Sequence, residues 1–258
     1  MSGVSRVSLA RRDAELRELM DDPDCDPERL RRTLERFDLV NRAVSSWGRV
    51  YRTHVRPALS AARAESAARV ESARASDSPA LRPLRILDLG CGGGDVLRRI
   101  VRRARRDGFD VEGLGIDPDP RSLAVARVTR PIAGVEYREC MSRDLVAEGA
   151  RFDVVISNHV LHHLGDADRA AWFAESEKLA DRLAVHSDIA RGRLAYAGFA
   201  IGIAPLAPGS LLRVDGLRSI RRSFTVGEIA AELPEGWRAE RVGPFRLLAV
   251  YRAQVSRD

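Results

Sequence analysis

Residues 84–95, Leu-Arg-Ile-Leu-Asp-Leu-Gly-Cys-Gly-Gly-Gly-Asp, decide the fold class of this 258-residue chain. The stretch begins with an apolar run of strand length, and a segment rich in Arg, Val and Leu follows it with helical character. The glycines between them let the backbone turn sharply and approach a ligand, and the N-terminus of the following helix offers unpaired amides. The stretch therefore predicts a strand, a turn and a helix that bind a nucleotide-like ligand.

Short apolar runs and helical stretches alternate after this turn. The runs at 111–116, 135–137, 152–157 and 183–188 predict strands, and a helix is expected at 166–179. Strands that alternate with helices indicate βαβ units, so we expect an α/β fold with a mainly parallel sheet covered by helices on both faces.

The end of the chain has a different pattern. Residues 237–242 and 246–251 are two β-rich runs joined by Gly243 and Pro244. A short connection between two such runs is typical of a hairpin, which would bring an antiparallel strand into the sheet.

The first 80 residues look helical and distinct from the rest. Asp26 is a suitable cap and Pro27 a suitable first residue of a helix, and apolar residues then recur at three- or four-residue steps. A run rich in Ala, Arg, Ser and Glu at 60–78 follows and is expected to mark a boundary. We therefore predict an N-terminal helical cap over residues 1–80 and a second domain over residues 81–258.

The basic composition does not indicate a nucleic-acid partner. The formal net charge is +6, but only Lys178 is a lysine among 43 basic residues, and most arginines are interspersed with acids. Such a bias reflects a genome rich in G and C, whereas a nucleic-acid footprint requires clustering on one surface. Aromatic residues make up only 5% and leave few platforms for stacking bases. We expect no nucleic-acid partner.

Three widely spaced cysteines, Cys25, Cys91 and Cys140, fit reduced thiols better than disulfides. The N-terminus lacks the apolar region of a signal peptide, so a cytoplasmic location is expected. Residues 194–212 carry no charge, but their glycines and prolines would break a membrane-spanning helix. We expect no membrane span there and instead predict a lid insertion near 190–222.

The glycine turn excludes two common nucleotide sites. In the dinucleotide fingerprint a third glycine would stand where this chain has Asp95, whose carboxylate would also repel a pyrophosphate. No Gly-Lys-Ser/Thr occurs, so the turn is not a P-loop. An adenosine with a cationic amino-acid tail fits better, because Asp88 and Asp95 are placed to meet an ammonium or a sulfonium.

The turn resembles the glycine-rich motif of class I S-adenosylmethionine-dependent methyltransferases. The pattern Asp-x-Gly-x-Gly-x-Gly lies at 88–94, Ile-Asp-Pro at 116–118 is similar to that family's ribose-binding acid, and 152–164 is similar to its segment beside the methyl donor. The resemblance implies a Rossmann-like, seven-stranded, mostly parallel sheet and S-adenosylmethionine as cofactor. The residues it assigns to cofactor binding are Asp88, Gly90, Gly92, Asp95, Asp117, Pro118, Met141, Ser142 and Asn158.

One position departs from the family pattern. Many relatives carry an Asp after the third strand for the adenine amino group, and Met141 stands at the aligned position. Two alternatives stay open: backbone groups of Met141 and Ser142 hold the adenine with the Met141 side chain packed on the ring, or Asp144 reaches it.

Four of the five histidines lie at the ends of the fourth and fifth predicted strands, the edge at which open α/β sheets bind ligands. Methyl transfer to a hydroxyl requires removal of its proton, and imidazole is suited to take it. We predict His159 or His162 as the base, His163 as a structural residue, and His186 as a catalytic residue paired with Asp188.

A metal-binding interpretation is less favourable. His159, His162 and Asp188 together suggest a magnesium site, since some oxygen methyltransferases chelate a catechol through Mg²⁺. Magnesium prefers carboxylates and waters to imidazoles, so we expect no metal.

The acceptor is expected to be an apolar, aromatic small molecule. The lid would cover it from one side, and Trp47 and Tyr51 would close the other. Arg221 and Arg222 are either a solvated pair or a site for an acidic group of the acceptor.

A narrower resemblance concerns three segments, at 22–27, 186–189 and 219–224. They look like bacterial methyltransferases found with type III polyketide synthases, which act on phenolic or quinone-type products. The resemblance implies O-methylation in secondary metabolism, and a homodimer is a further possibility.

The segment Ser-Asn-His-Val at 157–160 lacks the prolines and the aromatic residue that methyltransferases of nucleobase amines carry. C- or N-methylation of a small molecule, and a cofactor-binding protein without catalytic activity, remain as alternatives.

Overall fold

The computed structural model describes residues 8–73 and 82–253. Its centre is a seven-stranded sheet with the order β3-β2-β1-β4-β5-β7-β6. The strands are β1 Leu84–Leu89, β2 Val111–Ile116, β3 Val135–Arg138, β4 Phe152–Asn158, β5 Ala180–Ile189, β6 Trp237–Val242 and β7 Arg246–Arg252. The first five run parallel, whereas β7 is antiparallel to both β5 and β6. The predicted α/β fold with a C-terminal hairpin is confirmed.

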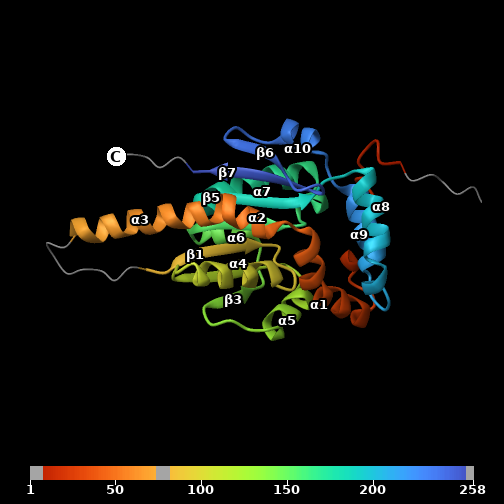
Figure 1. The fold of residues 1–258 in the computed structure, drawn as a ribbon, viewed down its shortest axis with the longest axis horizontal. Coiled ribbons are helices and arrows are strands. Elements are labelled where there is room, and N and C mark those ends of the chain that lie inside the picture. Colours follow the sequence, from red (N-terminus) through yellow and green to blue (C-terminus); the bar gives the residue numbers. More distant parts are fainter. Residues whose placement is uncertain (1–7, 74–81, 254–258) are drawn as a thin grey trace, which may run out of the picture.

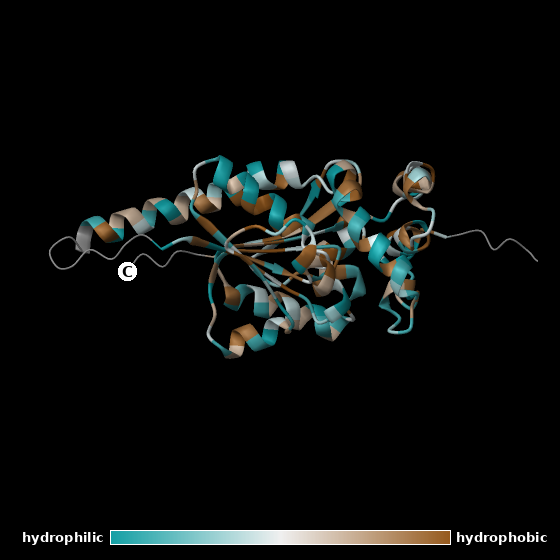
Figure 2. Cartoon of the chain, turned by 90° about the horizontal axis from the view of Figure 1, so that it is seen from below, coloured by the Kyte–Doolittle hydropathy of each residue, from teal (hydrophilic) through white to brown (hydrophobic). Residues whose placement is uncertain are grey.

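Helices cover both faces of the sheet, as Figure 2 shows with the sheet seen edge-on. The N-terminal part contains η1 Leu19–Asp21, α1 Pro27–Val44, α2 Trp47–Val50, the π-helix η2 Tyr51–Val55 and α3 Arg56–Ala73. The parallel half contains α4 Asp95–Arg106, α5 Pro120–Val128, α6 Ser142–Ala147, η3 Leu161–His163 and α7 Asp166–Leu179. After β5 come α8 Arg193–Gly202, η4 Ala204–Leu206, α9 Leu212–Arg222 and α10 Val226–Glu232.

The start of α1 follows from local chemistry. Oδ1 of Asp26 accepts hydrogen bonds from the amides of Glu28 and Arg29, each at 2.9 Å, and Pro27 occupies the first helical position. The expected helix start is confirmed.

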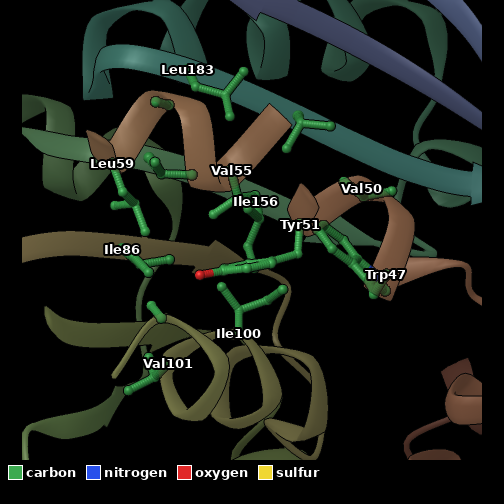
Figure 3. Packing of buried hydrophobic residues seen from close by; sticks show 14 of the residues in the cluster. Trp47, Val50, Tyr51, Val55, Leu59, Ile86, Ile100, Val101, Ile156 and Leu183 are labelled. Carbon is green, nitrogen blue, oxygen red and sulfur yellow. The ribbon is translucent and has the colours of Figure 1, made fainter. Parts of the chain in front are cut away.

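Part of the predicted N-terminal cap packs into the core of the sheet domain. Trp47, Tyr51 and Leu59 are buried in the same hydrophobic cluster as Ile86 and Ile100 of the sheet domain. Figure 3 shows these side chains interlocked between α2, η2, α3 and the strands. Residues 47–62 therefore belong to the core of the sheet domain.

Figure 1 shows α1, α8 and α9 gathered at one end of the sheet, where the parallel strands end. The strap is residues 8–26, which precede α1, and the lid is residues 193–222, which contain α8, η4 and α9. Together with α1 they enclose the carboxyl end of the sheet.

Candidate active site

A cavity of about 780 Å³ lies at the carboxyl ends of the parallel strands. Its volume falls in the range of about 300–1,000 Å³ typical of small-molecule sites. The sheet domain lines it through the glycine turn, α1 through Leu34 and Phe37, the strap through Glu18 and the lid through Phe199. All nine residues predicted to bind the cofactor line this cavity.

The glycine turn has a backbone that only glycine adopts without strain. Gly90 has φ +66°, and a Cβ there would lie 2.8 Å from Cγ2 of Val160. Gly94 has φ +72°, and a Cβ there would lie 2.4 Å from the Tyr137 hydroxyl. The sharp turn predicted from the sequence therefore depends on these glycines.

Two buried carboxylates at the turn, Asp88 and Asp95, have little pairing with cations: Arg99 lies 3.7 Å from Asp95. The side chain of Asp88 is 1% exposed, and neither of its oxygens has a hydrogen-bond partner among the described residues. Asp95, the first residue of α4, accepts a hydrogen bond of 3.1 Å from Asn41. Burial raises the pKa of both carboxyls, and the charges of Asp95 and Asp117 raise the pKa of Asp88 further.

Asp117 follows β2 and points into the same cavity. Its carboxylate accepts hydrogen bonds of 2.9 Å from the amides of Gly92 and Asp119, and burial raises its pKa. The three acids, with Gly90 and Gly92, form what we call the turn wall. A buried cluster of carboxylates is stabilised by a cationic ligand, so the wall fits the sulfonium and ammonium of S-adenosylmethionine.

The position of Asp144 argues against one of the two alternatives for adenine recognition. Oδ2 of Asp144 accepts a hydrogen bond of 2.8 Å from the Met141 amide, which caps α6, and Asp144 does not line the cavity. The Met141 side chain is 38% exposed and lines the cavity beside Cys140 and Ser142. Asp144 is therefore not placed to reach an adenine, and the amide of Met141 is already used.

A second group of residues that line the cavity holds a histidine between two carboxylates. Nδ1 of His162 donates to Asp188 at 2.8 Å, and Nε2 lies 3.1 Å from Oε1 of Glu18. Burial alone would lower the pKa of His162, but the two carboxylates raise it to about 9. In return, the imidazolium holds the pKa of Asp188 well below its usual range. We call Glu18, His159, His162 and His163, with Asp188 behind them, the histidine wall.

His159 is held in its neutral form. Its Nε2 accepts a hydrogen bond of 2.6 Å from Arg246, and its Nδ1 lies 3.7 Å from Asp188. Burial and the charge of Arg246 hold the pKa of His159 well below the ordinary value. Arg246 also donates to Asn158 at 2.6 Å and to Ser187 at 3.0 Å, which fixes the guanidinium at the end of β4.

The expectation for His186 is wrong. His186 is fully buried and does not line the cavity; its nitrogens lie 2.8 and 3.0 Å from the hydroxyls of Ser157 and Ser176. Its ring stacks on Trp237, and burial lowers its pKa to about 3. Asp188 pairs with His162 instead, because the loop after β4 returns its histidines to the end of β5.

His163 lines the cavity, with Nδ1 3.3 Å from Asp21 and Nε2 3.7 Å from Glu18. His159, His162 and Asp188 bring potential ligand atoms close together, as do Glu18, His162 and His163. His162 belongs to both groups and makes hydrogen bonds to Asp188 and Glu18.

The lid contributes apolar surface to the cavity. Phe199 and Leu212 line it, together with Trp172 and Ile189 from the sheet domain. Trp47 and Tyr51 do not, contrary to expectation: Trp47 donates to Asn158 at 3.0 Å and the Tyr51 hydroxyl bonds Asp107 at 3.0 Å within the core.

Neither predicted arginine of the lid faces the cavity. Arg221 pairs with Asp13 of the strap at 2.6 Å, and Arg222 lies 3.2 Å from Asp21. No described helix is long and apolar enough to cross a membrane.

Sequence reasoning missed Glu18 and Arg246. Glu18 lies 144 residues from His162 in the chain, and its neighbours form an ordinary stretch of charged and apolar residues. Arg246 starts a strand that was predicted, but nothing local indicates that its side chain is buried against Asn158. Neither position carries a signal in the sequence.

Comparison with known proteins addresses the same segment. Residues 86–181 match a family model described as "Methyltransferase domain". Residues 86–181 are thus a methyltransferase domain. Domains of this class use S-adenosylmethionine as cofactor, which the turn wall fits.

The methyltransferase domain has relatives named "Ubiquinone biosynthesis O-methyltransferase". In one strain of Cereibacter sphaeroides the relative is 41% identical over 85 residues, which cover 32% of each chain. In a second strain it is 36% identical over 156 residues, 60% of this chain and 49% of the relative. The matches thus span between about a third and a half of the length of these relatives.

A solved structure, the plantazolicin methyltransferase BpumL in complex with SAH, shares the fold. The TM-score is 0.50 at 11% identity, and the alignment covers 88% of this chain and 96% of the other. This agreement concerns the arrangement of sheet and helices.

Proposed function

We propose that the methyltransferase domain transfers a methyl group from S-adenosylmethionine to a hydroxyl oxygen of a phenolic or quinone-type small molecule. The observation that carries the proposal is the His162–Asp188 pair, 2.8 Å apart, in the wall of the cavity that also contains the turn wall. The relatives, which are named as O-methyltransferases of ubiquinone biosynthesis, support the same reaction.

The acceptor's place is the apolar part of the cavity. Phe199 and Leu212 of the lid and Trp172 of α7 line the same cavity as His159 and His162. An aromatic ring packed there would bring its hydroxyl to the histidines, with the methyl donor on the far side.

His162 acts as the general base in this proposal. Asp188 fixes the ring through Nδ1, so that Nε2 accepts the proton: the O–H bond of the acceptor breaks and an N–H bond forms. When bound, the cofactor would supply an electrophilic methyl group, and its sulfur would keep the electrons of the carbon–sulfur bond as the leaving group. The remaining acceleration comes from alignment of the reacting atoms.

His159 has a different role. Its Nε2 already accepts a hydrogen bond from Arg246, and its depressed pKa makes it a weak base. The Arg246 guanidinium beside it provides positive charge close to the developing phenolate.

The proposal is tested with isotopically methyl-labelled S-adenosylmethionine and a panel of acceptors. The panel contains a catechol, a hydroxyquinone, the methyl ether of each and an aromatic amine of matched size. Mass spectrometry is expected to show one added methyl group on the hydroxyl compounds, located on oxygen by fragmentation. If the label were found on ring carbon or on the amine, the reaction would be C- or N-methylation and not O-methylation. If no labelled product formed, the protein would be a binding protein without methyltransferase activity.

A further inference from the structure

The strap is fastened to the lid by several hydrogen bonds. Asp215 of α9 accepts from the amides of Leu19 and Met20 at 2.8 and 3.0 Å, and the amide of Asp13 donates to the Arg221 carbonyl at 3.0 Å. Because the bonds at Leu19 and Met20 adjoin residue 18, the strap and α9 together determine where Glu18 lies.

Glu18 lies against the proton-accepting nitrogen of the base. Its carboxylate is 5% exposed, with Oε1 3.1 Å from Nε2 of His162, and the Ser219 hydroxyl donates to the same oxygen at 2.8 Å. An imidazole nitrogen has one in-plane site, either a proton to donate or a lone pair to accept. An acceptor hydroxyl and Glu18 therefore cannot use Nε2 at the same time.

We propose that Glu18 is a gate on the base: its carboxylate occupies Nε2 of His162 when no acceptor is bound, and the acceptor hydroxyl must displace it, and with it the strap, before methyl transfer. The inference rests on the proposed role of His162. Glu18 is a positioning residue here, because it acts on the reaction through His162.

Charged groups face His162 from every element around it. Asp188 comes from β5 and Glu18 from the strap, while the other titratable or charged groups nearby are Asp21, His159, His163, Asp215, Arg222 and Arg246. With both carboxylates in contact, His162 holds a proton at neutral pH and is a donor at both nitrogens. Loss of Glu18 removes one of the two contacts, so the ring releases its proton more easily and Nε2 becomes an acceptor.

The test is Glu18→Gln, which keeps the size of the side chain and removes its charge. Imidazole NMR of the full chain is expected to show His162 titrating near pH 9 in the wild type and at least about one pH unit lower in E18Q. In activity, the acidic limb of kcat/KM for a phenol is expected to move to lower pH, with a rise of about tenfold at pH 7.

Asp13→Asn is the matched control, since it weakens the strap's ion pair with Arg221 without touching His162. It is expected to leave the His162 titration unchanged. Ser219→Ala removes the hydroxyl that holds Glu18 and is expected to shift the titration in the same direction by less, so it carries the test if E18Q does not fold.

An unchanged titration midpoint in E18Q and S219A would overturn the gate, and so would a shifted midpoint without movement of the activity limb. A shifted midpoint in a protein that methylates no hydroxyl would instead refute the proposed function, while the coupling of Glu18 to His162 would stand. The two proposals therefore fail in distinguishable ways.

Discussion

The turn wall and the histidine wall of the cavity differ in how their buried charges are neutralised. In the turn wall, Asp88, Asp95 and Asp117 are brought together without an equal number of cations, and the pKa values of all three are raised. In the histidine wall, Glu18 and Asp188 enclose the His162 cation, and the pKa values of both acids are lowered. The excess of negative charge at the turn indicates that a cationic ligand binds there. At the histidines, positive and negative charges of the protein neutralise one another, so no charged ligand is needed.

The largest effect on turnover is expected from a substitution in the histidine wall. His162→Gln is expected to lower kcat for a phenolic acceptor by about 10²–10⁴-fold, because the general base is lost. Steady-state kinetics measures the effect, and calorimetry is expected to show nearly unchanged cofactor affinity. His159→Gln is the matched comparison, with a fall of less than about tenfold, since its Nε2 is already engaged by Arg246. Wild-type rates in H162Q would remove His162 as the base.

A smaller effect is expected from the turn wall. Asp117→Ala is expected to raise the Kd of S-adenosylmethionine by about 10–100-fold, since hydrogen bonds to a charged group contribute roughly 1.5–3 kcal/mol. Isothermal titration calorimetry measures it. Asp144→Ala is the control, because Asp144 is a nearby acid that caps α6 and does not line the cavity. The D144A variant is expected to bind the cofactor with the affinity of the wild type. Equal affinities in D117A and the wild type would exclude the ribose assignment.

The residues of the two walls also differ in how far the sequence predicted them. The turn wall was predictable because its residues are adjacent in the chain and a glycine-rich turn after a strand carries a strong local signal. Asp188 was predicted with the wrong partner: strand positions place His186 and Asp188 on one face, but the loop after β4 supplies His162. The apolar stripe at Trp47 and Tyr51 predicted burial but could not specify the surface, which is the sheet core. Glu18 depends on a contact across 144 residues, for which no local pattern exists.

The histidine wall predicts a dependence of stability on pH. The folded-state pKa of His162 is raised to about 9, so its stabilisation is fully present below the unfolded value near 6.5 and is lost as pH rises through 9. The free energy of unfolding is expected to fall by on the order of 1–2 kcal/mol between pH 7 and 9.5 through this group. Denaturant unfolding at both pH values measures it, with H162Q as the control that lacks this part of the fall. Parallel curves for the two proteins would contradict the ion-pair assignment.

The smallest effect on turnover is expected at His186, which belongs to neither wall. His186→Gln is expected to leave kcat and the cofactor Kd within about twofold, because the ring bonds Ser157 and Ser176 away from the cavity. Its cost lies in folding: an imperfect replacement of two buried hydrogen bonds destabilises by roughly 1–3 kcal/mol, and the stacking on Trp237 is lost as well. Thermal unfolding and kinetics on the same preparation separate the two effects. A large fall in kcat with unchanged stability would mean that His186 affects the histidine wall through β5. The groups that matter for catalysis would then extend beyond the residues that line the cavity.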